Sequence, residues 1–482
     1  MRTPARPVRA AISHLGRLMA RPFSRAQRTW AHFQNNSRGN VSIIFGFCAI
    51  GLVGGVGIAI DTSVAYNVKS RLGAAVDAAA LAGARVFASA NRDTDIEKFF
   101  DANFPDGYMG SILQPLDISS NGENRTVTVT ARATIPTFFM RVLGRESTDI
   151  AATSEATLSS RDVEVSLVLD VTVSMDTNGK IDDLKVAAKE LVDIVVQDLQ
   201  VPFFSKVALV PYSMGVNAGD LADQVRGPYI EDATCEYPDE PDCETFRFKN
   251  TSGNWREQDI STCVTERTGL HAYTDHAPNL ASVGRNFPRQ DHNPCLEPEI
   301  VPLSSNKTAL KDAINGLDPV GSTAGQIGIA WGWYMISPNF GYLFPGEGAA
   351  VPYGSVNLGQ EVLKVVVIMT DGEFNTVYFD GVIARDSTSG SGDDKYMINQ
   401  DATNGDGYHQ SEQLCAAMKA EGIIVYTVGF DFSNVSNPED VTDLMNNCAT
   451  SPDHVYLPES GTALKEAFKD IAAQISNLRI SM

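Results

Sequence analysis

Short, mainly apolar runs that end in polar residues are the most informative hydrophobic pattern in this chain. Residues 163–169 form one such run, and residues 364–369 form another. Mainly apolar runs of this length are typical of strands buried on both faces of a parallel sheet. The same pattern predicts strands at 163–170, 206–212, 364–370, 423–430 and 455–457.

Helical periodicity fills the intervals between these runs. Apolar residues there recur at spacings of three and four, as on one face of a helix. Helices are expected at 181–199, 308–317, 324–336, 411–420, 438–447 and 463–478. Strands that alternate with helices predict an α/β domain over 161–482, with a doubly wound, mostly parallel sheet covered on both faces. Two stretches, 227–301 and 373–410, are too long for ordinary connections and are expected to be insertions, which at this length are usually either functional or disordered.

The segment before this domain has a different pattern. Residues 126–136 alternate between apolar and polar positions, as in a half-buried strand, and 149–158 do so more weakly. Residues 62–90 are rich in Ala and lack Pro, which favours a helix. The small apolar face of this expected helix could pack against another helix or against the helix's own domain. Residues 62–160 are therefore expected to form a helix and a small α+β stalk region.

A segment of 20 residues without charge, 41–60, precedes this helix. At about 1.5 Å per residue, a helix of this length spans the roughly 30 Å hydrocarbon core of a bilayer. The alternatives are a buried soluble helix and a cleaved signal peptide. The flanking charges disfavour the first, and the long basic region and long apolar stretch disfavour the second. A single transmembrane anchor is expected at 39–61.

Charge is distributed very unevenly along the chain. Residues 1–60 contain eight arginines and no lysine or acid. Because the whole chain of 482 residues has a net charge of −21, the remainder carries −29. Arginines before the apolar segment predict a basic cytoplasmic tail at 1–38 and an outward-facing body. An acidic body argues against nucleic-acid binding, which needs a basic face.

Cysteine usage agrees with an outward-facing body. Cys48 lies in the apolar segment, and six cysteines lie beyond it, which suits an oxidising compartment and up to three disulfides. Cys415 and Cys448 flank one expected strand, so we predict a bridge between them. The pairing of Cys235, Cys243, Cys263 and Cys295 stays open.

The candidate chemistry lies where the expected strands end. Asp170, Thr172 and Ser174 follow the first apolar run, and Asp371 follows the run at 364–370. Open α/β sheets bind ligands at the carboxyl ends of their strands. Carboxylate and hydroxyl oxygens suit a hard cation such as Mg²⁺ or Mn²⁺, with Ca²⁺ as a further candidate. Thr323, in Gly-Ser-Thr-Ala-Gly before an expected helix, completes the set, although a threonine there can also be a helix cap.

This combination resembles a von Willebrand factor A domain with a metal-ion-dependent adhesion site. The family pattern Asp-x-Ser-x-Ser, a loop Thr and a later Asp matches Asp170, Thr172, Ser174, Thr323 and Asp371, with Thr172 where Ser is usual. The resemblance implies that the three hydroxyls bind the cation directly and that the carboxylates act largely through water. It also implies an open position for a carboxylate from a protein partner.

The N-terminal segment has a second resemblance. Arg-Gly-Asn-Val-Ser-Ile-Ile-Phe at 38–45, followed by the Ala-rich helix that ends in Gly-Ala-Arg at 83–85, is similar to TadE/TadG-like proteins of bacterial tight-adherence (Flp) pilus systems. TadG-like proteins combine such an anchor with a C-terminal von Willebrand A domain. Ile44 stands where TadE-like pseudopilins carry Glu, which argues against prepilin-type cleavage after Gly39.

Other functional signals are weaker. Residues 404–407 resemble part of a calcium loop, but the first and twelfth ligand positions fall on Ala402 and Gln413. A zinc site from Cys263, His271, His276 and Cys295 is disfavoured in an oxidising compartment. No hydrolase or phosphate-binding motif is present in the sequence, so we expect a protein that is not an enzyme.

The resulting hypothesis is a membrane-anchored A-domain protein that acts in assembly or anchoring of a tight-adherence pilus. It would bind a carboxylate of another pilus or envelope component through a divalent metal. A surface adhesin for host or matrix ligands is the alternative, and a metal-dependent hydrolase is a third candidate.

Overall fold

A computed structural model describes residues 40–480 except 88, 90, 122–125, 158–160, 202 and 358. The expected cytoplasmic tail, 1–38, lies outside the described residues. The chain divides into two compact units, Met1–Thr157 and Leu158–Met482. Each unit has a hydrophobic core of its own.

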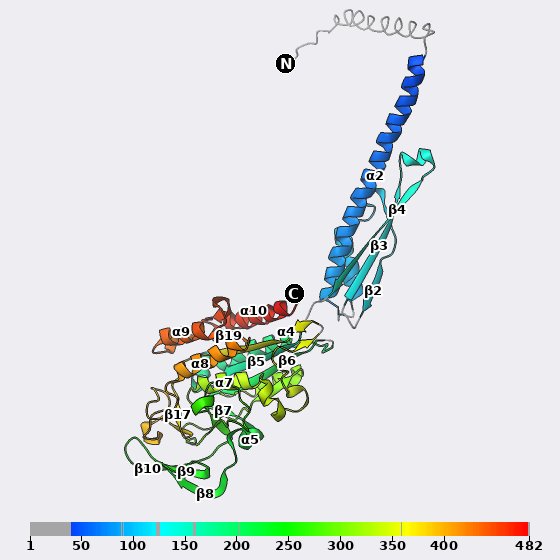
Figure 1. Ribbon diagram of the computed structural model, residues 1–482. Helices are drawn as coiled ribbons and strands as arrows, with labels where there is room; N and C mark the ends of the chain where they lie inside the picture. Colours follow the sequence, from blue (N-terminus) through cyan, green and yellow to red (C-terminus); the bar gives the residue numbers. More distant parts are fainter. Residues whose placement is uncertain are drawn as a thin grey trace, which may run out of the picture. The chain divides into compact units, whose positions relative to one another are not determined.

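The first unit is built on one long helix, α2, which runs from Asn40 to Arg85 (Figure 1). This helix is long and apolar enough to cross a membrane. Its first part exposes large apolar side chains, among them Phe45, Phe47 and Leu52. Such exposure is unfavourable in water and suits a lipid environment.

The later part of α2 covers a small antiparallel sheet. The central strand β3 (Thr126–Pro136) pairs with β1 (Ile112–Leu113) and β2 (Asp117–Asn121) on one side and β4 (Ser147–Thr157) on the other. A helix, α3 (Arg92–Asn103), packs beside α2. Alternate residues of β3 are buried, as its pattern predicted. The small face of α2 therefore packs on its own domain, with Val68, Leu72, Val76, Ala79 and Ala80 in the core.

The second unit contains a six-stranded sheet in the order β13-β6-β5-β16-β19-β20. The strands are β5 (Val163–Asp170), β6 (Ser205–Tyr212), β13 (Val301–Ser304), β16 (Leu363–Thr370), β19 (Ile424–Gly429) and β20 (Val455–Tyr456). All neighbours are parallel except the pair β13 and β6. Every residue of β5 and β16 is buried, which explains their mainly apolar sequences. The buried charges of Glu164 and Lys364 on these neighbouring strands pair with each other. The expected mostly parallel α/β fold is confirmed.

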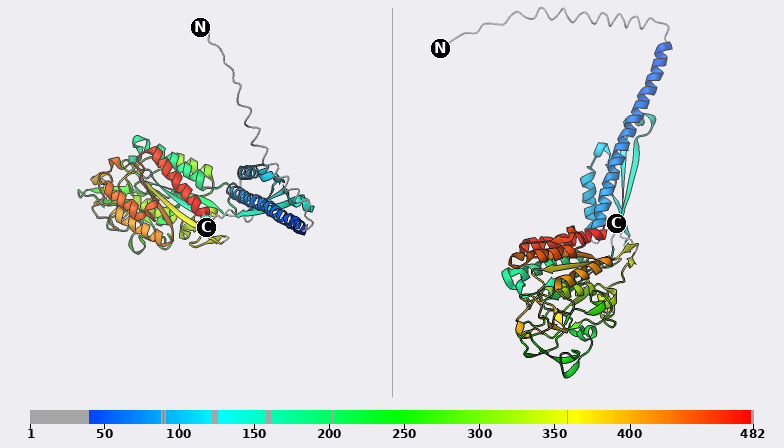
Figure 2. Two further views of the ribbon diagram at one scale, coloured as in Figure 1. Left: turned by 90° about the horizontal axis from the view of Figure 1, so that it is seen from above. Right: turned by 60° about the vertical axis from the view of Figure 1, so that its left-hand side comes forward.

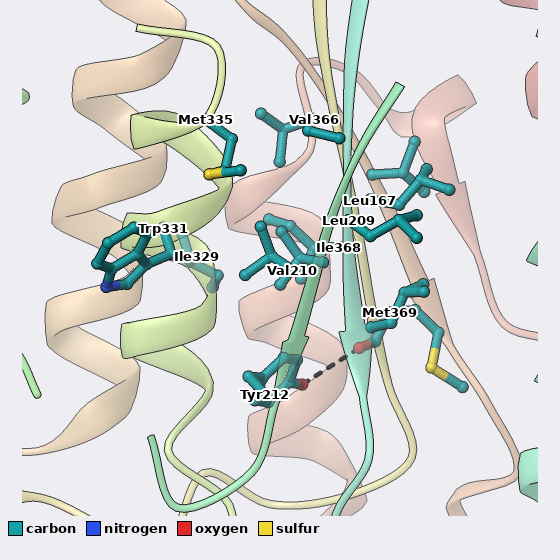
Figure 3. Close-up of a cluster of buried hydrophobic side chains, with 14 of the residues drawn as sticks. Leu167, Leu209, Val210, Tyr212, Ile329, Trp331, Met335, Val366, Ile368 and Met369 are labelled. Atoms are coloured by element: carbon teal, nitrogen blue, oxygen red, sulfur yellow. Dashed lines mark hydrogen bonds between the residues drawn. The ribbon is translucent and has the colours of Figure 1, made fainter. Parts of the chain in front are cut away.

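Helices cover both faces of this sheet. Figures 1 and 2 show α4 (Lys180–Val195) and α10 (Gly461–Ile480) on one face and α7 (Gly325–Tyr334) and α8 (Gly407–Ala420) on the other. Two further helices, α6 (Lys307–Asn315) and α9 (Pro438–Cys448), contact α4 and α8, respectively. Figure 3 shows Ile329 of α7 pointing towards Val210 and Ile368 of the sheet, whereas Trp331 lies on the far side of the helix, where it contacts the rings of Tyr334 and Phe340.

Two details differ from the sequence-based expectations. Helix α4 ends at Val195 rather than at 199, because the chain turns there and the backbone N–H of Gln197 donates to Ser205 Oγ at 2.8 Å. The antiparallel edge strand β13 was not expected. It is short and contains Pro302, which an edge strand tolerates.

The insertion at 227–301 is ordered and has strands of its own. A three-stranded sheet consists of β8 (Ile230–Glu236), β9 (Cys243–Lys249) and β10 (Trp255–Asp259), and it shares a small core with Phe287. A second sheet consists of β7 (Val216–Asn217), β11 (Cys263–Thr265) and β12 (Gly284–Arg285), and a short helix, α5 (Ala222–Arg226), precedes the insertion. Two short antiparallel pairs complete the unit, β14 (Val356–Asn357) with β15 (Gln360–Glu361) and β17 (Tyr378–Phe379) with β18 (Val382–Ile383).

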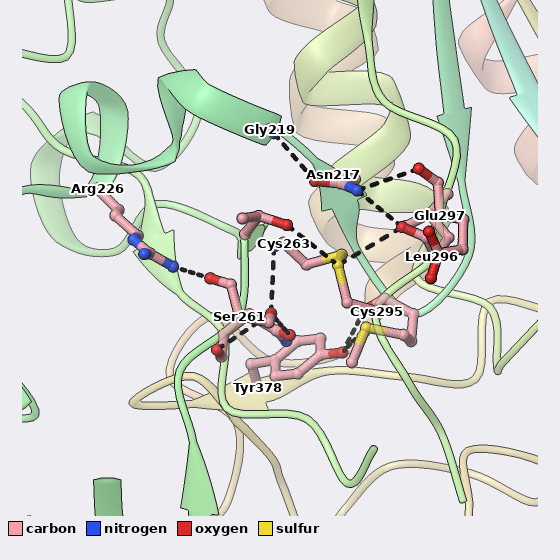
Figure 4. The surroundings of a disulfide bond; sticks show 12 residues. Asn217, Gly219, Arg226, Ser261, Cys263, Cys295, Leu296, Glu297 and Tyr378 are labelled. Atoms are coloured by element: carbon pink, nitrogen blue, oxygen red, sulfur yellow. Dashed lines mark hydrogen bonds between the residues drawn. A yellow bond between two sulfur atoms is a disulfide. The ribbon is translucent and has the colours of Figure 1, made fainter. Parts of the chain in front are cut away.

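Three disulfides tie these segments together. The bridges are Cys235–Cys243, Cys263–Cys295 and Cys415–Cys448. The last confirms the sequence-based pairing and joins α8 to α9. The bridge Cys263–Cys295 closes a loop of the insertion next to Asn217, as Figure 4 shows. Its two cysteines are therefore not zinc ligands.

Candidate metal centre

The carboxyl ends of β5 and β16 place the candidate ligands side by side. These strands are adjacent and parallel, with Leu169 paired to Met369. Asp170 is the last residue of β5, and Asp371 follows the last residue of β16. Adjacent parallel strands that end at the same level present their following residues to one another. The two carboxylates, 201 residues apart in the sequence, thus converge.

A chain of short hydrogen bonds links four of the five candidate side chains. Thr172 Oγ1 donates to Asp170 Oδ1 at 2.6 Å, and Ser174 Oγ donates to Asp371 Oδ1 at 2.6 Å. The two hydroxyl oxygens lie 2.9 Å apart. A hydroxyl has a single proton. When both protons point at ionised carboxylates, the two hydroxyl oxygens face each other with lone pairs alone, and a cation would relieve that repulsion.

Asp170 is the deepest member of this cluster. It is fully buried, and its second oxygen, Oδ2, accepts from Thr370 Oγ1 at 2.8 Å and from Tyr212 OH at 3.1 Å. Burial and the nearby charge of Asp371 raise the pKa of Asp170 to about 6. Burial also raises the pKa of Asp371. Two carboxylates that resist ionisation in each other's presence would be stabilised in their charged form by a divalent cation.

Thr323 lies on the loop that leads into α7. Its backbone N–H donates to Asn375 Oδ1 at 2.9 Å, and its carbonyl accepts from the N–H groups of Asn375 and Thr376. The same loop is joined to the first one, because the N–H of Val173 donates to the carbonyl of Gly321 at 3.0 Å. Residue 323 is thus held beside the cluster by backbone contacts rather than by its side chain.

These residues surround one open pocket of about 360 Å³. Its walls include Thr172, Ser174, Thr323 and Asp371, whereas Asp170 lies behind them. Among the described residues, no group of three or more His, Cys, Asp or Glu side chains is placed to hold a metal ion. A cation in this pocket would therefore depend on the hydroxyl oxygens as well as on the carboxylates.

The donor set fits a hard divalent cation. Hydroxyl and carboxylate oxygens are ligands that Mg²⁺ and Mn²⁺ accept, and Mg²⁺ keeps several waters. Asp170, behind the hydroxyls, can act on a cation only through Thr172 or through water. The structure thus brings Asp170, Thr172, Ser174 and Asp371 into direct contact and adds Thr323 at the pocket wall.

Lys180 is the most important neighbour that sequence reasoning missed. Its ammonium group is almost fully buried and lies 3.0 Å from Asp371 Oδ2 and 3.7 Å from Asp431 Oδ2. It also donates to the carbonyl of Asp431 at 3.1 Å. Lys180 therefore has two acidic partners and can keep one if the other binds a cation. No pattern in the sequence indicates that Lys180 lies on the face of α4 that is turned towards the site.

The insertions also contribute to the site. Asn293, from the first insertion, donates to Ser322 Oγ at 2.7 Å and accepts from the N–H of Ser322 at 3.0 Å. Gly321 has a φ of +76°, and a Cβ there would lie 2.7 Å from Asn293 Oδ1, so this turn requires glycine. Asn375, from the second insertion, holds Thr323. Both insertions therefore contact the loop that carries Thr323, through Asn293 and Asn375.

Comparisons with known protein families found a match for the N-terminal part of the chain. Residues 39–86 match the family model described as "Putative Flp pilus-assembly TadE/G-like". This match confirms the sequence-based resemblance of the anchor and the helix that follows it. No curated protein matches the chain. The residues that match this family model lie ahead of the α/β unit.

Solved structures similar to this chain include von Willebrand domains of pilus proteins. The pilus adhesin SpaC from Lactobacillus rhamnosus GG is 13% identical, with 77% of this chain and 35% of that chain covered and a TM-score of 0.34. The vWF domain of the type V pili tip protein Mfa5 from Porphyromonas gingivalis is 12% identical, with 67% and 97% covered and a TM-score of 0.36. The chain thus spans about a third of the adhesin.

A third similar structure contains a metal. Proximal thread matrix protein 1 from the mussel byssus, with its MIDAS motif occupied by zinc, is 13% identical. The similarity covers 65% of this chain and 46% of that chain, with a TM-score of 0.29.

Proposed function

We propose that this chain is a membrane-anchored component of a tight-adherence pilus system that binds a protein partner through a divalent cation. The cation would be Mg²⁺ or Mn²⁺, held by Thr172, Ser174 and Thr323, with Asp170 and Asp371 supporting it. In this proposal the anchor lies in the bacterial inner membrane with its N-terminus in the cytoplasm. The role is assembly or anchoring, not catalysis.

One observation carries the metal part of this proposal. Two hydroxyl oxygens lie 2.9 Å apart at the pocket, and each is 2.6 Å from an oxygen of a buried carboxylate. A cation beside them would be bound by lone pairs of the hydroxyl oxygens while the carboxylates accept the hydroxyl protons. The pocket beside them gives a partner access.

The proposed contact with the partner depends on the charge of the cation. The bound cation would supply a positive centre that a carboxylate of the partner can share. The acidic body of the protein does not prevent this contact, because the local charge at the site is set by the ion. Lys180 lies 3.0 Å from Asp371 and 3.7 Å from Asp431, so it could keep Asp431 as a counter-ion when Asp371 turns to the ion. Thr172, Ser174 and Thr323 would hold the ion, Asp371 would support it, and Asp170 would fix the orientation of Thr172.

The membrane part of the proposal rests on α2 and on the family match at 39–86. A pilus component that is fixed in the membrane and presents an adhesion-type unit suits assembly, since the partner can be held without being modified.

A titration of residues 158–482 with Mg²⁺ and Mn²⁺ by calorimetry tests the site. This unit has its own core and all three disulfides, so it is expected to fold. Saturable binding is expected in the wild type and is expected to be lost in Asp371→Asn, which removes one buried charge without changing size. Asp239→Asn, at an exposed acid of the insertion, is the matched control. Equal binding in both variants would contradict the proposed ligands.

The role in the cell has a separate test. Asp371→Asn is expected to abolish rescue of surface pili in a strain that lacks this protein, while Asp239→Asn restores them. Full rescue by a variant shown to bind no cation would refute metal-dependent assembly.

A further inference from the structure

The turn between β3 and β4 exposes an unusual number of large apolar side chains. Phe138 is 74% exposed, Val142 is 87% exposed and Leu143 is 69% exposed. Residues 140–143 form a single helical turn, and exposed Arg141 lies among the apolar residues. A cluster of apolar side chains of this kind is costly in water and marks a contact surface. We name residues 138–143 the apolar loop.

The apolar loop is ordered by contacts within itself and its strands. The N–H of Thr137 donates to the carbonyl of Glu146 at 3.0 Å, and the N–H of Arg145 donates to the carbonyl of Met140 at 3.1 Å. Gly144 closes the turn with a φ of +86°. The exposed side chains are therefore held outward by a defined backbone.

The apolar loop is also fixed to α2 through Asp61, the first charged residue after the uncharged segment. The carboxylate of Asp61 accepts from the N–H groups of Phe138, Phe139 and Met140 at 3.2, 2.9 and 2.7 Å. Asp61 is only 6% exposed. The carboxylate that would mark the membrane boundary thus serves as a cap for the loop rather than projecting into water.

The contact extends into the uncharged segment itself. Gly57 is buried under Phe139, and a Cβ at this glycine would lie 2.6 Å from Phe139 Cβ. Gly57 lies four residues before Asp61, which is about 6 Å along a helix. Figure 1 shows the end of the β3–β4 hairpin beside α2. The loop therefore lies at the level of the last helical turn of the apolar segment.

We propose that the apolar loop inserts into the outward-facing leaflet of the membrane beside α2, as a second attachment point of the first unit. This inference rests on α2 being the membrane anchor but is independent of the metal centre. Amphipathic segments that lie in the interface bury their apolar side chains about 5–10 Å deep. That depth matches the level of the Gly57–Asp61 turn.

Lipid is favoured as the occupant because the loop continues an apolar surface that already requires lipid. Val56, Ile58 and Ile60 on the same turns of α2 are 57%, 40% and 43% exposed. Arg141 beside them can extend its guanidinium to lipid phosphates while its methylene groups stay in the apolar layer. A second attachment point would prevent the first unit from rotating about the axis of α2, which a single helix alone cannot do.

Nitroxide labelling of the full-length chain in phosphatidylglycerol-containing vesicles tests this proposal. Cys48 is the free cysteine among the described residues, so Cys48→Ala permits single labels at Val142→Cys and, independently, at Phe138→Cys. The control is Ser119→Cys on β2, an exposed position that pairs with Thr128, eight residues before the end of β3. Native Cys48 reports on the anchor.

The labels at 142 and 138 are expected to be more accessible to oxygen, which dissolves in lipid, than to a water-soluble nickel chelate. The label at 119 is expected to show the reverse. If the label at 142 behaves like that at 119 while the label at Cys48 is in lipid, the loop proposal is overturned and the anchor stands. A label at 142 shielded from both reagents would overturn it in favour of a second copy of this chain. A water-exposed label at Cys48 would overturn both.

Discussion

Replacing Lys180 with Met tests whether the buried charges of the candidate centre are arranged for a cation. Methionine keeps the length and the apolar stem of lysine but removes the charge. The ammonium lies 3.0 Å from Asp371 Oδ2, and the two side chains are 4% and 0% exposed. At an effective dielectric constant of about 20, this attraction is worth about 5 kcal/mol. Removing one partner of a buried pair typically costs about 3–5 kcal/mol.

The cost should depend on divalent cations. Without them, Lys180→Met leaves Asp170 and Asp371 buried without a compensating charge, and the unfolding free energy is expected to fall by about 4 kcal/mol. With saturating Mg²⁺, the ion supplies that charge, and most of the loss should disappear. The variant is also expected to bind Mg²⁺ more tightly, because a repelling positive charge is absent.

Urea unfolding of residues 158–482 measures both quantities. The fluorescence of Trp331 and Trp333, which are 1% and 3% exposed, reports loss of the core. Each protein is measured with a chelator and with saturating Mg²⁺, and Lys185→Met on the same helix is the control. A loss of stability that is the same with and without Mg²⁺ would refute the reasoning. Lys180 would then be a structural partner of Asp371, and no cation would reach that carboxylate.

Two further predictions concern the rest of the second unit. Burial raises the pKa of Glu266 to about 7, so its contribution to stability is fully present below its unfolded value and is lost as the pH rises through about 7. In urea unfolding, the free energy of unfolding of Glu266→Gln should therefore rise by about 3 kcal/mol relative to that of the wild type as the pH increases from about 4 to about 8. A difference between the two proteins that does not change with pH would contradict this. The paired change Cys415→Ser and Cys448→Ser removes a disulfide that spans 33 residues, and we expect a loss of about 3–4 kcal/mol. An unchanged melting temperature under oxidising conditions would show that this bridge does not stabilise the unit.

Much of the candidate site could be predicted from local pattern. Asp170, Thr172 and Ser174 are close in sequence, and the apolar run before them identifies a strand whose end must carry them. Asp371 follows a run of the same kind. Because parallel strands end on one edge of a sheet, two such runs are enough to predict that their polar ends meet. The alternating pattern of β3 and the uncharged part of α2 could be predicted for the same reason, because each depends only on residues that are neighbours in the sequence.

The structure supplied what depends on long-range contacts. Lys180 and Asp431 come from α4 and from the loop after β19, and only the sheet order brings them to Asp371. The pairing of Cys263 with Cys295 and the use of Asn293 to hold Ser322 depend on how the first insertion folds, which no periodic pattern encodes. The burial of Asp61 under the apolar loop is of the same kind, since Phe139 lies 78 residues away.

The sequence by itself determined the long apolar helix, the central strands and the helices between them, because hydrophobic periodicity and charge act over a few residues. It thus defined the apolar anchor, the buried strands and the ligand types at their ends. Only the tertiary structure decided which charges neutralise one another, which cysteines pair and which loop meets the anchor. Those outcomes depend on distances between residues far apart in the chain, and such distances exist only after the elements have packed.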